Sequence, residues 1–112
     1  MILKFLKESK AVKSFFVKDL KIFTNGFFIK ISVKLIDNSD LFITEYVDEE
    51  ERNYAYHWQD KNKKMILRWD NAPYHKEILT FPHHCHKPDG IFESFDITLN
   101  DIFKIIENII FS

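Results

Sequence analysis

Four runs between residues 27 and 70 alternate apolar and polar side chains, which is the period of a β-strand that buries one face. They cover residues 27–36, 41–47, 53–59 and 65–70. Three short polar segments, 37–40, 48–51 and 60–63, separate them. Because short loops join consecutive strands most easily when those strands are antiparallel, we expect an antiparallel meander.

The N-terminal segments add a helix and further strand. Residues 2–8 predict a short helix. Residues 12–22 mix apolar and lysine side chains with a period near two, which indicates one or two strands. The Asn25-Gly26 pair that follows predicts a hairpin turn, because both residues tolerate positive φ.

The C-terminal segment is predicted to be a helix. Thr98 is a suitable N-cap, and Asp101 at the third helical position approximates a capping box. Apolar residues follow at helical spacing, namely Leu99, Ile102, Phe103, Ile106, Ile109 and Ile110. Before this helix, Pro73 and Pro82 bar a long helix, so we expect residues 71–95 to be irregular.

These elements predict an α+β fold in a single domain that spans residues 1–112. We expect a curved antiparallel β-sheet of about five strands, packed with a C-terminal helix and a short N-terminal helix. The chain is long enough for one hydrophobic core and too short for two. The C-terminal helix should cover one face of the sheet. The other face is left to the N-terminal helix, to residues 71–95, or to the second subunit of a homodimer.

Composition argues against a membrane or secreted protein. No stretch approaches the roughly 20 apolar residues that span a bilayer. The N-terminus lacks the apolar stretch and small-residue cleavage site of a signal peptide. Only one cysteine is present, Cys85, so no intrachain disulfide can form. We therefore expect a cytoplasmic protein.

The net charge of −1 conceals two parts of opposite sign. Residues 1–36 hold eight lysines and two acidic side chains, a balance of +6. Residues 37–112 hold eight basic and fifteen acidic side chains, a balance of −7. The basic segment either binds a polyanion or forms the solvated faces of a helix and strands. Lys30 and Lys34, on one side of a predicted strand, are candidate substrate contacts.

The end of the last predicted strand and the loop after it concentrate the side chains that can do chemistry. Arg68 and Asp70 lie two apart and therefore share a face of the strand. This pair fits a structural ion pair as well as a site in which arginine binds phosphate. Four of the five histidines follow within twelve residues, and His75, His84 and His86 are our candidates. Two histidines in different environments can act as acid and base in RNA cleavage without a metal or a protein nucleophile.

A metal site is the competing interpretation. In an extended segment, His84 and His86 share a face, and a His-x-His pair can chelate zinc or another transition metal. His75, Asp70 or Glu45 would have to complete such a site. A third interpretation is that the histidines only form hydrogen bonds with backbone carbonyls in a loop. Our prediction includes no metal and no cofactor.

The run 53–59 places Tyr54, Tyr56 and Trp58 on one face. If exposed, these rings would stack on unpaired RNA bases. If buried, they would belong to the core, which we expect for at least two of them. Tyr56 is also one strand away from Arg68 in the predicted hairpin, so its hydroxyl is a candidate substrate contact.

Three blocks of sequence carry a family resemblance. They are Leu41-Phe-Ile-Thr-Glu-Tyr-Val47, Tyr54-Ala-Tyr-His-Trp-Gln-Asp60, and Arg68-Trp-Asp-Asn-Ala-Pro-Tyr-His75 followed by Phe81-Pro-His-His-Cys-His86. From about residue 27 to the C-terminal helix, the chain resembles the toxin component of the TumE family of bacterial and archaeal toxin–antitoxin modules. The third block is the most specific of the three.

The resemblance implies a toxin of a type II toxin–antitoxin system, neutralised by an antitoxin that is typically a helix-turn-helix DNA-binding protein. We predict that it is a metal-independent endoribonuclease. In this scheme Arg68 neutralises phosphate charge, His75 and either His84 or His86 act as base and acid, and Asp70 fixes a tautomer. The alternatives are a non-catalytic module that blocks a target and docks the antitoxin, and a metalloenzyme with histidine ligands.

Overall fold

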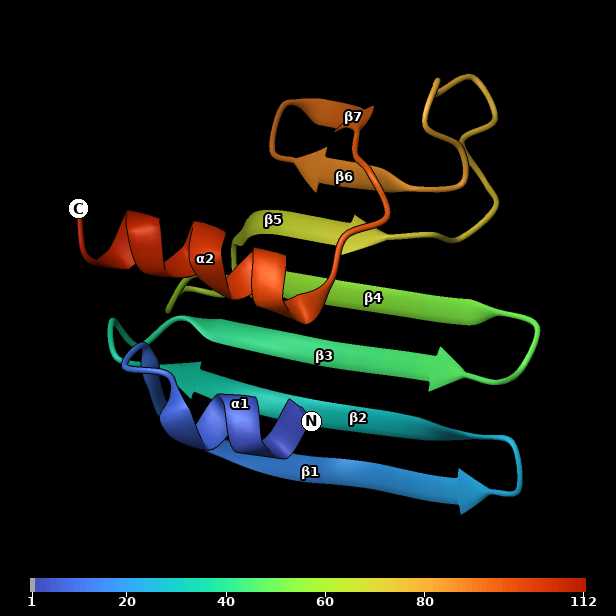
Figure 1. The fold of residues 1–112 in the computed structure, drawn as a ribbon. Coiled ribbons are helices and arrows are strands. Elements are labelled where there is room, and N and C mark those ends of the chain that lie inside the picture. Colours follow the sequence, from blue (N-terminus) through green and yellow to red (C-terminus); the bar gives the residue numbers. More distant parts are fainter. Residues whose placement is uncertain (1) are drawn as a thin grey trace.

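The computed structural model describes residues 2–112, which form one seven-stranded sheet and two helices (Figure 1). The elements are α1 (Ile2–Glu8), β1 (Val12–Phe23), β2 (Gly26–Leu35), β3 (Asp40–Val47), β4 (Arg52–Gln59), β5 (Met65–Asp70), β6 (His84–Lys87), β7 (Gly90–Glu93) and α2 (Leu99–Ile110). Each strand pairs antiparallel with the next one along the chain. The predicted α+β class and the antiparallel meander are confirmed.

The sheet has two strands more than the expected five. Strands β6 and β7 lie within residues 71–95, which we expected to be irregular. The sequence of β6 is His-Cys-His-Lys, and these four residues are too few for an alternation to identify a strand. Its backbone is extended because it pairs with β5 on one side and β7 on the other. The strand was missed because its pairing, and not its own pattern, defines it.

Strand β1 is one strand of twelve residues, and its hairpin with β2 closes one residue earlier than predicted. Phe23 pairs with Gly26, so Thr24 and Asn25 form the turn. Neither Asn25 nor Gly26 has a positive φ, so our reason for the turn is wrong. Glycine is required at position 26 because a Cβ there would lie 1.9 Å from the carbonyl oxygen of Val47.

Both helices pack on the same face of the sheet, in front of it in Figure 1. The core combines Leu6 of α1 and Ile102 of α2 with the apolar face of the strands. That face contains Ile29, Ile31, Val33, Leu35, Leu41, Ile43, Tyr54, Tyr56, Trp58 and Trp69. The rings of Phe5 and Phe103 meet with centroids 5.1 Å apart and join the two helices. Helix α2 begins with the predicted capping box of Thr98 and Asp101.

The opposite face of the sheet, called the open face below, has no helix over it in the described part of the chain (Figure 1). Helix α1, one of the three alternatives expected to cover this face, does not cover it, because α1 belongs to the core on the other side. Residues 71–83 reach only its β5–β6 end, where His75 approaches His84 and His86. Of the helices in residues 2–112, none is long and apolar enough to cross a membrane.

Candidate functional site

Strand register places four of the candidate residues in two neighbouring rows on the open face. Directly paired residues of antiparallel strands point to the same side of a sheet. One row contains His57 of β4, Arg68 of β5 and His86 of β6. The next row contains Asp70 of β5 and His84 of β6. Pairing across β5 and β6 therefore brings the arginine and the aspartate beside two histidines.

The carboxylate of Asp70 is the centre of this cluster. It is buried, and it accepts hydrogen bonds from Arg68 Nε at 3.1 Å and from the backbone N–H of Ala72 at 3.0 Å. His84 Nε2 lies 2.9 Å from Oδ1, and His86 Nε2 lies 3.3 Å from Oδ2. A buried charge is stable only when it is paired and hydrogen-bonded. Asp70 meets this requirement with two partners on each oxygen.

His75 joins the cluster from the loop after β5. Its ring centroid lies 4.9 Å from that of His84 and 5.7 Å from that of His86. The rings of His84 and His86 lie 4.8 Å apart. Nδ1 of His75 is 3.4 Å from the carboxylate of Glu77. The five residues predicted to be catalytic therefore meet at one end of the open face.

Access to solvent divides the cluster into an outer and an inner group. The side chains of Arg68, His75 and His86 are 37%, 27% and 24% exposed. Those of Asp70 and His84 are 7% and 3% exposed. A substrate on the open face can touch the outer group, whereas the inner group holds the outer side chains in position.

The two β6 histidines have different surroundings. Nδ1 of His84 lies 2.9 Å from the carbonyl oxygen of Pro82, and its Nε2 faces Asp70. Both contacts hold the ring of His84 in one orientation. Burial lowers the pKa of His86 from its ordinary value of 6.5. Asp70 opposes this shift, and His84, Arg68 and His75 reinforce it.

A hollow of about 510 Å³ on the open face extends to Arg68 and Asp70. Its other lining residues include Phe28, Thr44, Tyr46, Asn53 and Ala55. Thr44 pairs with Ala55, and Ala55 pairs with Asp70. The two residues next to Asp70 in its row across the sheet therefore have small side chains. The hollow therefore connects the middle of the open face with the cluster.

The three imidazoles could also hold a metal ion. One ligand atom from each of His75, His84 and His86 lies within 4.8 Å of the others. Three histidines with an open fourth position are a ligand set that suits Zn²⁺. Asp70 supplies carboxylate oxygens beside two of these rings. Arg68 acts against a cation there, because its positive charge already lies 3.1 Å from the same carboxylate.

Tyr56 and Glu45 lie on the helix face, away from the cluster. Tyr56 is fully buried and donates a hydrogen bond to Glu45, and Arg52 contacts both side chains. Tyr56 pairs with Trp69, so it points to the opposite side of the sheet from Arg68. Tyr56 is one strand away from Arg68, as expected, but its hydroxyl cannot serve as a substrate contact beside Arg68. Glu45 lies on the same helix face as Tyr56. It therefore cannot complete a metal site with the histidines, which lie on the open face.

Lys30 and Lys34 lie on the open face of β2, as the alternation predicts. Lys30 is exposed and lies in the row that leads through Thr44 to Asp70. Lys34 forms an ion pair with Asp40 at 2.7 Å, which neutralises much of its charge. The aromatic residues of β4 are all buried, so they form the core and cannot stack on RNA.

Sequence reasoning missed two further residues of the open face, Phe42 and His57. Phe42 pairs with His57, and His57 pairs with Arg68. Nδ1 of His57 is buried without a hydrogen-bond partner, and burial, together with Arg68, lowers the pKa of this ring. The alternation of β4 fixes the face of His57, but only strand register places it beside Arg68.

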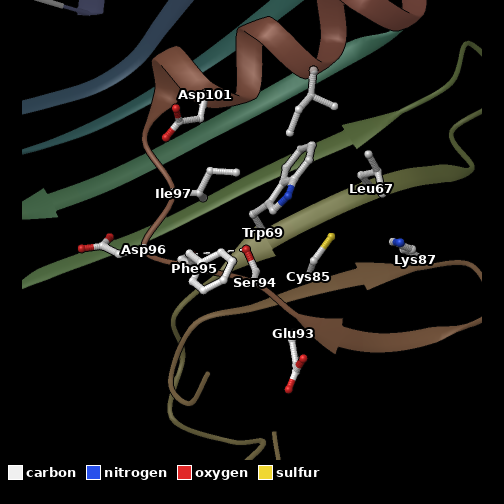
Figure 2. A pocket seen from close by; sticks show the side chains of 11 residues that line it. Leu67, Trp69, Cys85, Lys87, Glu93, Ser94, Phe95, Asp96, Ile97 and Asp101 are labelled. Carbon is white, nitrogen blue, oxygen red and sulfur yellow. Dashed lines mark hydrogen bonds between the residues drawn. The ribbon is translucent and has the colours of Figure 1, made fainter. Parts of the chain in front are cut away.

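A second hollow, also about 510 Å³, lies on the helix face between α2 and strands β5 to β7 (Figure 2). Leu67, Trp69 and Cys85 point toward it from the strands. Burial raises the pKa of the Cys85 thiol, which makes it a poor nucleophile. None of the five candidate catalytic residues lines this hollow. The candidate chemistry therefore remains on the open face.

Fold and site together define a small α+β protein whose uncovered sheet face ends in a cluster of histidines around an Arg–Asp pair. The sequence model of the family described as Toxin TumE matches residues 2–110. The chain belongs to the TumE toxin family, and membership of a toxin family implies an antitoxin partner. No curated protein and no solved structure matches the chain.

Proposed function

We propose that this toxin cleaves RNA, without a metal ion, at the cluster of Arg68, Asp70, His75, His84 and His86. The main support is that two accessible side chains suited to phosphate binding and proton transfer, Arg68 and His86, contact one buried carboxylate, and that accessible His75 lies beside the ring of His86. Because the carboxylate holds its neighbours in place before substrate arrives, little reorganisation is needed in the transition state.

In the proposed reaction, the 2′-hydroxyl of RNA attacks the adjacent phosphorus and the bond from phosphorus to the 5′-oxygen breaks. His86 accepts the proton of the 2′-hydroxyl, because its lowered pKa keeps it neutral at neutral pH. His75 gives a proton to the leaving 5′-oxygen. Arg68 neutralises the charge that develops on the phosphate. The products are a 2′,3′-cyclic phosphate and a 5′-hydroxyl.

Asp70 and His84 act as positioning residues in this scheme. A hydrogen bond from His86 Nε2 to Asp70 leaves Nδ1 of His86 as the basic nitrogen. The same carboxylate fixes the guanidinium of Arg68 through Nε, so the two terminal nitrogens of its fork remain for phosphate. His84 contacts the Asp70 carboxylate from the buried side and so helps to hold it in position.

The test is turnover of an end-labelled RNA by purified protein in excess chelator. We expect Arg68→Ala and His86→Ala to lower the cleavage rate by about 100-fold or more. The third variant, His84→Ala, should also be impaired. His83→Ala is the matched control, because that ring stacks on Tyr54 outside the cluster. Equal rates in all variants, or no cleavage by any sample, would discard the scheme.

A metalloenzyme is the second candidate, favoured by the three clustered imidazole nitrogens. It predicts that chelator abolishes cleavage and that added Zn²⁺ restores it. It also predicts metal in the purified protein by elemental analysis, with loss of that metal in His75→Ala. Full activity in chelator supports the metal-independent scheme instead.

The antitoxin partner is proposed to be a helix-turn-helix protein that meets the toxin in the cytoplasm. If the toxin is a non-catalytic module, the same cluster would bind its target or the antitoxin directly. A pull-down of the antitoxin that is lost on His75→Ala, together with no cleavage by the wild-type protein, would support that alternative.

A further inference from the structure

We propose that the open face is a track for single-stranded RNA, which crosses the strands and delivers the scissile phosphate to Arg68 and His86. This inference rests on the proposed ribonuclease function and adds the substrate class and its path. It concerns the side of the sheet that neither helix covers (Figure 1). Aromatic and basic side chains from the first three strands gather there.

One row of paired residues leads straight to the cluster. Phe16 of β1 pairs with Ser32, Ser32 with Phe42, Phe42 with His57, His57 with Arg68, and Arg68 with His86. Paired residues lie on the same face, and neighbouring strands are about 4.8 Å apart. The row therefore extends about 24 Å from Phe16 to His86. This is long enough for several nucleotides.

Aromatic rings along the track suit unpaired bases. Phe16 is 67% exposed, and Phe28 and Phe42 are partly exposed. The ammonium group of Lys18 lies 5.2 Å from the ring centre of Phe42, and that of Lys21 lies 5.6 Å from the ring centre of Phe28. Bases stack on such rings only when they are not enclosed in a duplex. The rings therefore favour single-stranded RNA.

The charge of the track suits a polyanion. Lys18, Lys21 and Lys30 lie over or beside its phenylalanine rings. The acidic neighbour Asp19 contacts Lys21 at 3.7 Å, but both side chains are exposed to water, so this pair is weak. Lysines that flank stacked bases can contact the phosphates between them.

The hollow on the open face continues the track to the cluster. It lies beside Phe28 and over Thr44 and Ala55, and it ends at Arg68 and Asp70. Small side chains at the two middle positions leave room for a nucleotide between the aromatic rings and the guanidinium. A larger residue in place of Ala55 would fill this room without removing a charge or a ring.

The test is fluorescence anisotropy with a labelled single-stranded RNA of mixed sequence and with the same RNA as a duplex. The protein carries His86→Ala, so that binding is measured without turnover. We expect the duplex to bind more weakly than the single strand. Phe42→Ala and Ala55→Leu, each added to His86→Ala, should weaken single-strand binding by about 10-fold. Phe95→Ala is the matched control, because this 83% exposed ring lies at the hollow on the helix face.

The outcomes distinguish failure of the RNA-binding track from failure of the ribonuclease proposal. Selective binding that Phe42→Ala weakens supports the track, even if the wild-type protein cleaves nothing and the ribonuclease proposal fails. Equal binding of single strand and duplex, or equal losses in Phe42→Ala and Phe95→Ala, overturns the track even if cleavage is observed. Binding of the antitoxin but of no RNA, lost on Phe42→Ala, assigns the face to a protein partner and also overturns it.

Discussion

At the scale of single residues, Asp70 organises the cluster more than any histidine does. Its carboxylate contacts Arg68, His84 and His86. The sequence alone offered two interpretations of Arg68 and Asp70, a structural ion pair and part of a site. In the structure the ion pair is formed and the histidines meet on the same carboxylate, so the two interpretations are compatible.

Asp70→Asn should destabilise the protein as well as the cluster. Replacing the carboxylate by an amide removes a charge that faces Arg68 and His84 and leaves these groups with a weaker partner. We expect the free energy of unfolding to fall by about 2 kcal/mol, measured by urea denaturation. Asp89→Asn, at an exposed turn, is the control. An unchanged urea midpoint in Asp70→Asn would show that the contacts contribute little.

The pH dependence of the cleavage rate should follow the protonation of the His86 ring. Burial lowers the pKa of this ring below its ordinary value of 6.5, so the neutral base persists into mildly acidic solution. The acid limb of the rate profile should therefore lie below pH 6.5, and His86→Gln should remove it. An acid limb above pH 6.5 in the wild-type protein would contradict this assignment.

Stability should change over the same pH range. A histidine with a lowered pKa in the folded state binds fewer protons than it does in the unfolded chain. Stability is therefore full above the unfolded pKa and falls as pH decreases through the folded one. His57 contributes in the same direction, because burial and Arg68 lower its pKa too. Urea midpoints at pH 7.5 and pH 5 would measure the loss, which should be smaller in His86→Gln.

At the scale of elements, the sheet register decides which side chains become neighbours. Alternation within each strand fixes a face, but pairing fixes a position along that face. The run of β4 illustrates both. Its alternation correctly separated Tyr56 from His57, and its register then placed His57, not Tyr56, beside Arg68.

Gly26→Ala tests the contact that fixes the hairpin between β1 and β2. The added Cβ would lie 1.9 Å from the carbonyl oxygen of Val47, so the backbone must shift. We expect a loss of about 2 kcal/mol or more in the free energy of unfolding. Asn25→Ala, in the same turn, is the control and should change stability by less. Similar losses for both variants would attribute the effect to the turn as a whole.

At the scale of the whole molecule, both helices cover one side of the sheet and leave the other side without a helix in residues 2–112. The basic N-terminal part of the sequence supplies β1 and β2, and Lys18, Lys21, Lys30 and Lys34 of these strands lie on that open side. The histidine cluster comes from β5, β6 and the loop between them. Folding therefore brings the lysines of the first two strands and the histidine cluster to one surface, where we propose that RNA binds.

RNA binding to this surface should depend steeply on salt. If Lys18, Lys21, Lys30 and Arg68 each neutralise one phosphate, the slope of log K against log salt concentration is about −2.8 for a single strand. Affinity should then fall by about 50-fold between 50 and 200 mM salt. The double variant Lys21→Ala/Lys30→Ala should halve the slope. Lys104→Ala, on α2, is the control and should leave the slope unchanged.

Much of the fold could be predicted because it depends on local patterns. The four alternating runs became β2 to β5, and Thr98 with Asp101 formed the expected capping box. Strands β6 and β7 could not be predicted, because each has only four residues and so shows no clear period. Their extended backbone depends on pairing between β5, β6 and β7.

The amino-acid sequence by itself determined the period and face of the central strands and the start of the last helix, and it singled out the five candidate residues. Only the tertiary structure decided that Asp70 is their common partner, that Tyr56 is buried, and that the open face aligns Phe42 and His57 with Arg68. The physical reason is that side-chain direction along a strand is a local property of the backbone. Contact between strands depends on register, which is set by hydrogen bonds and packing between distant parts of the chain.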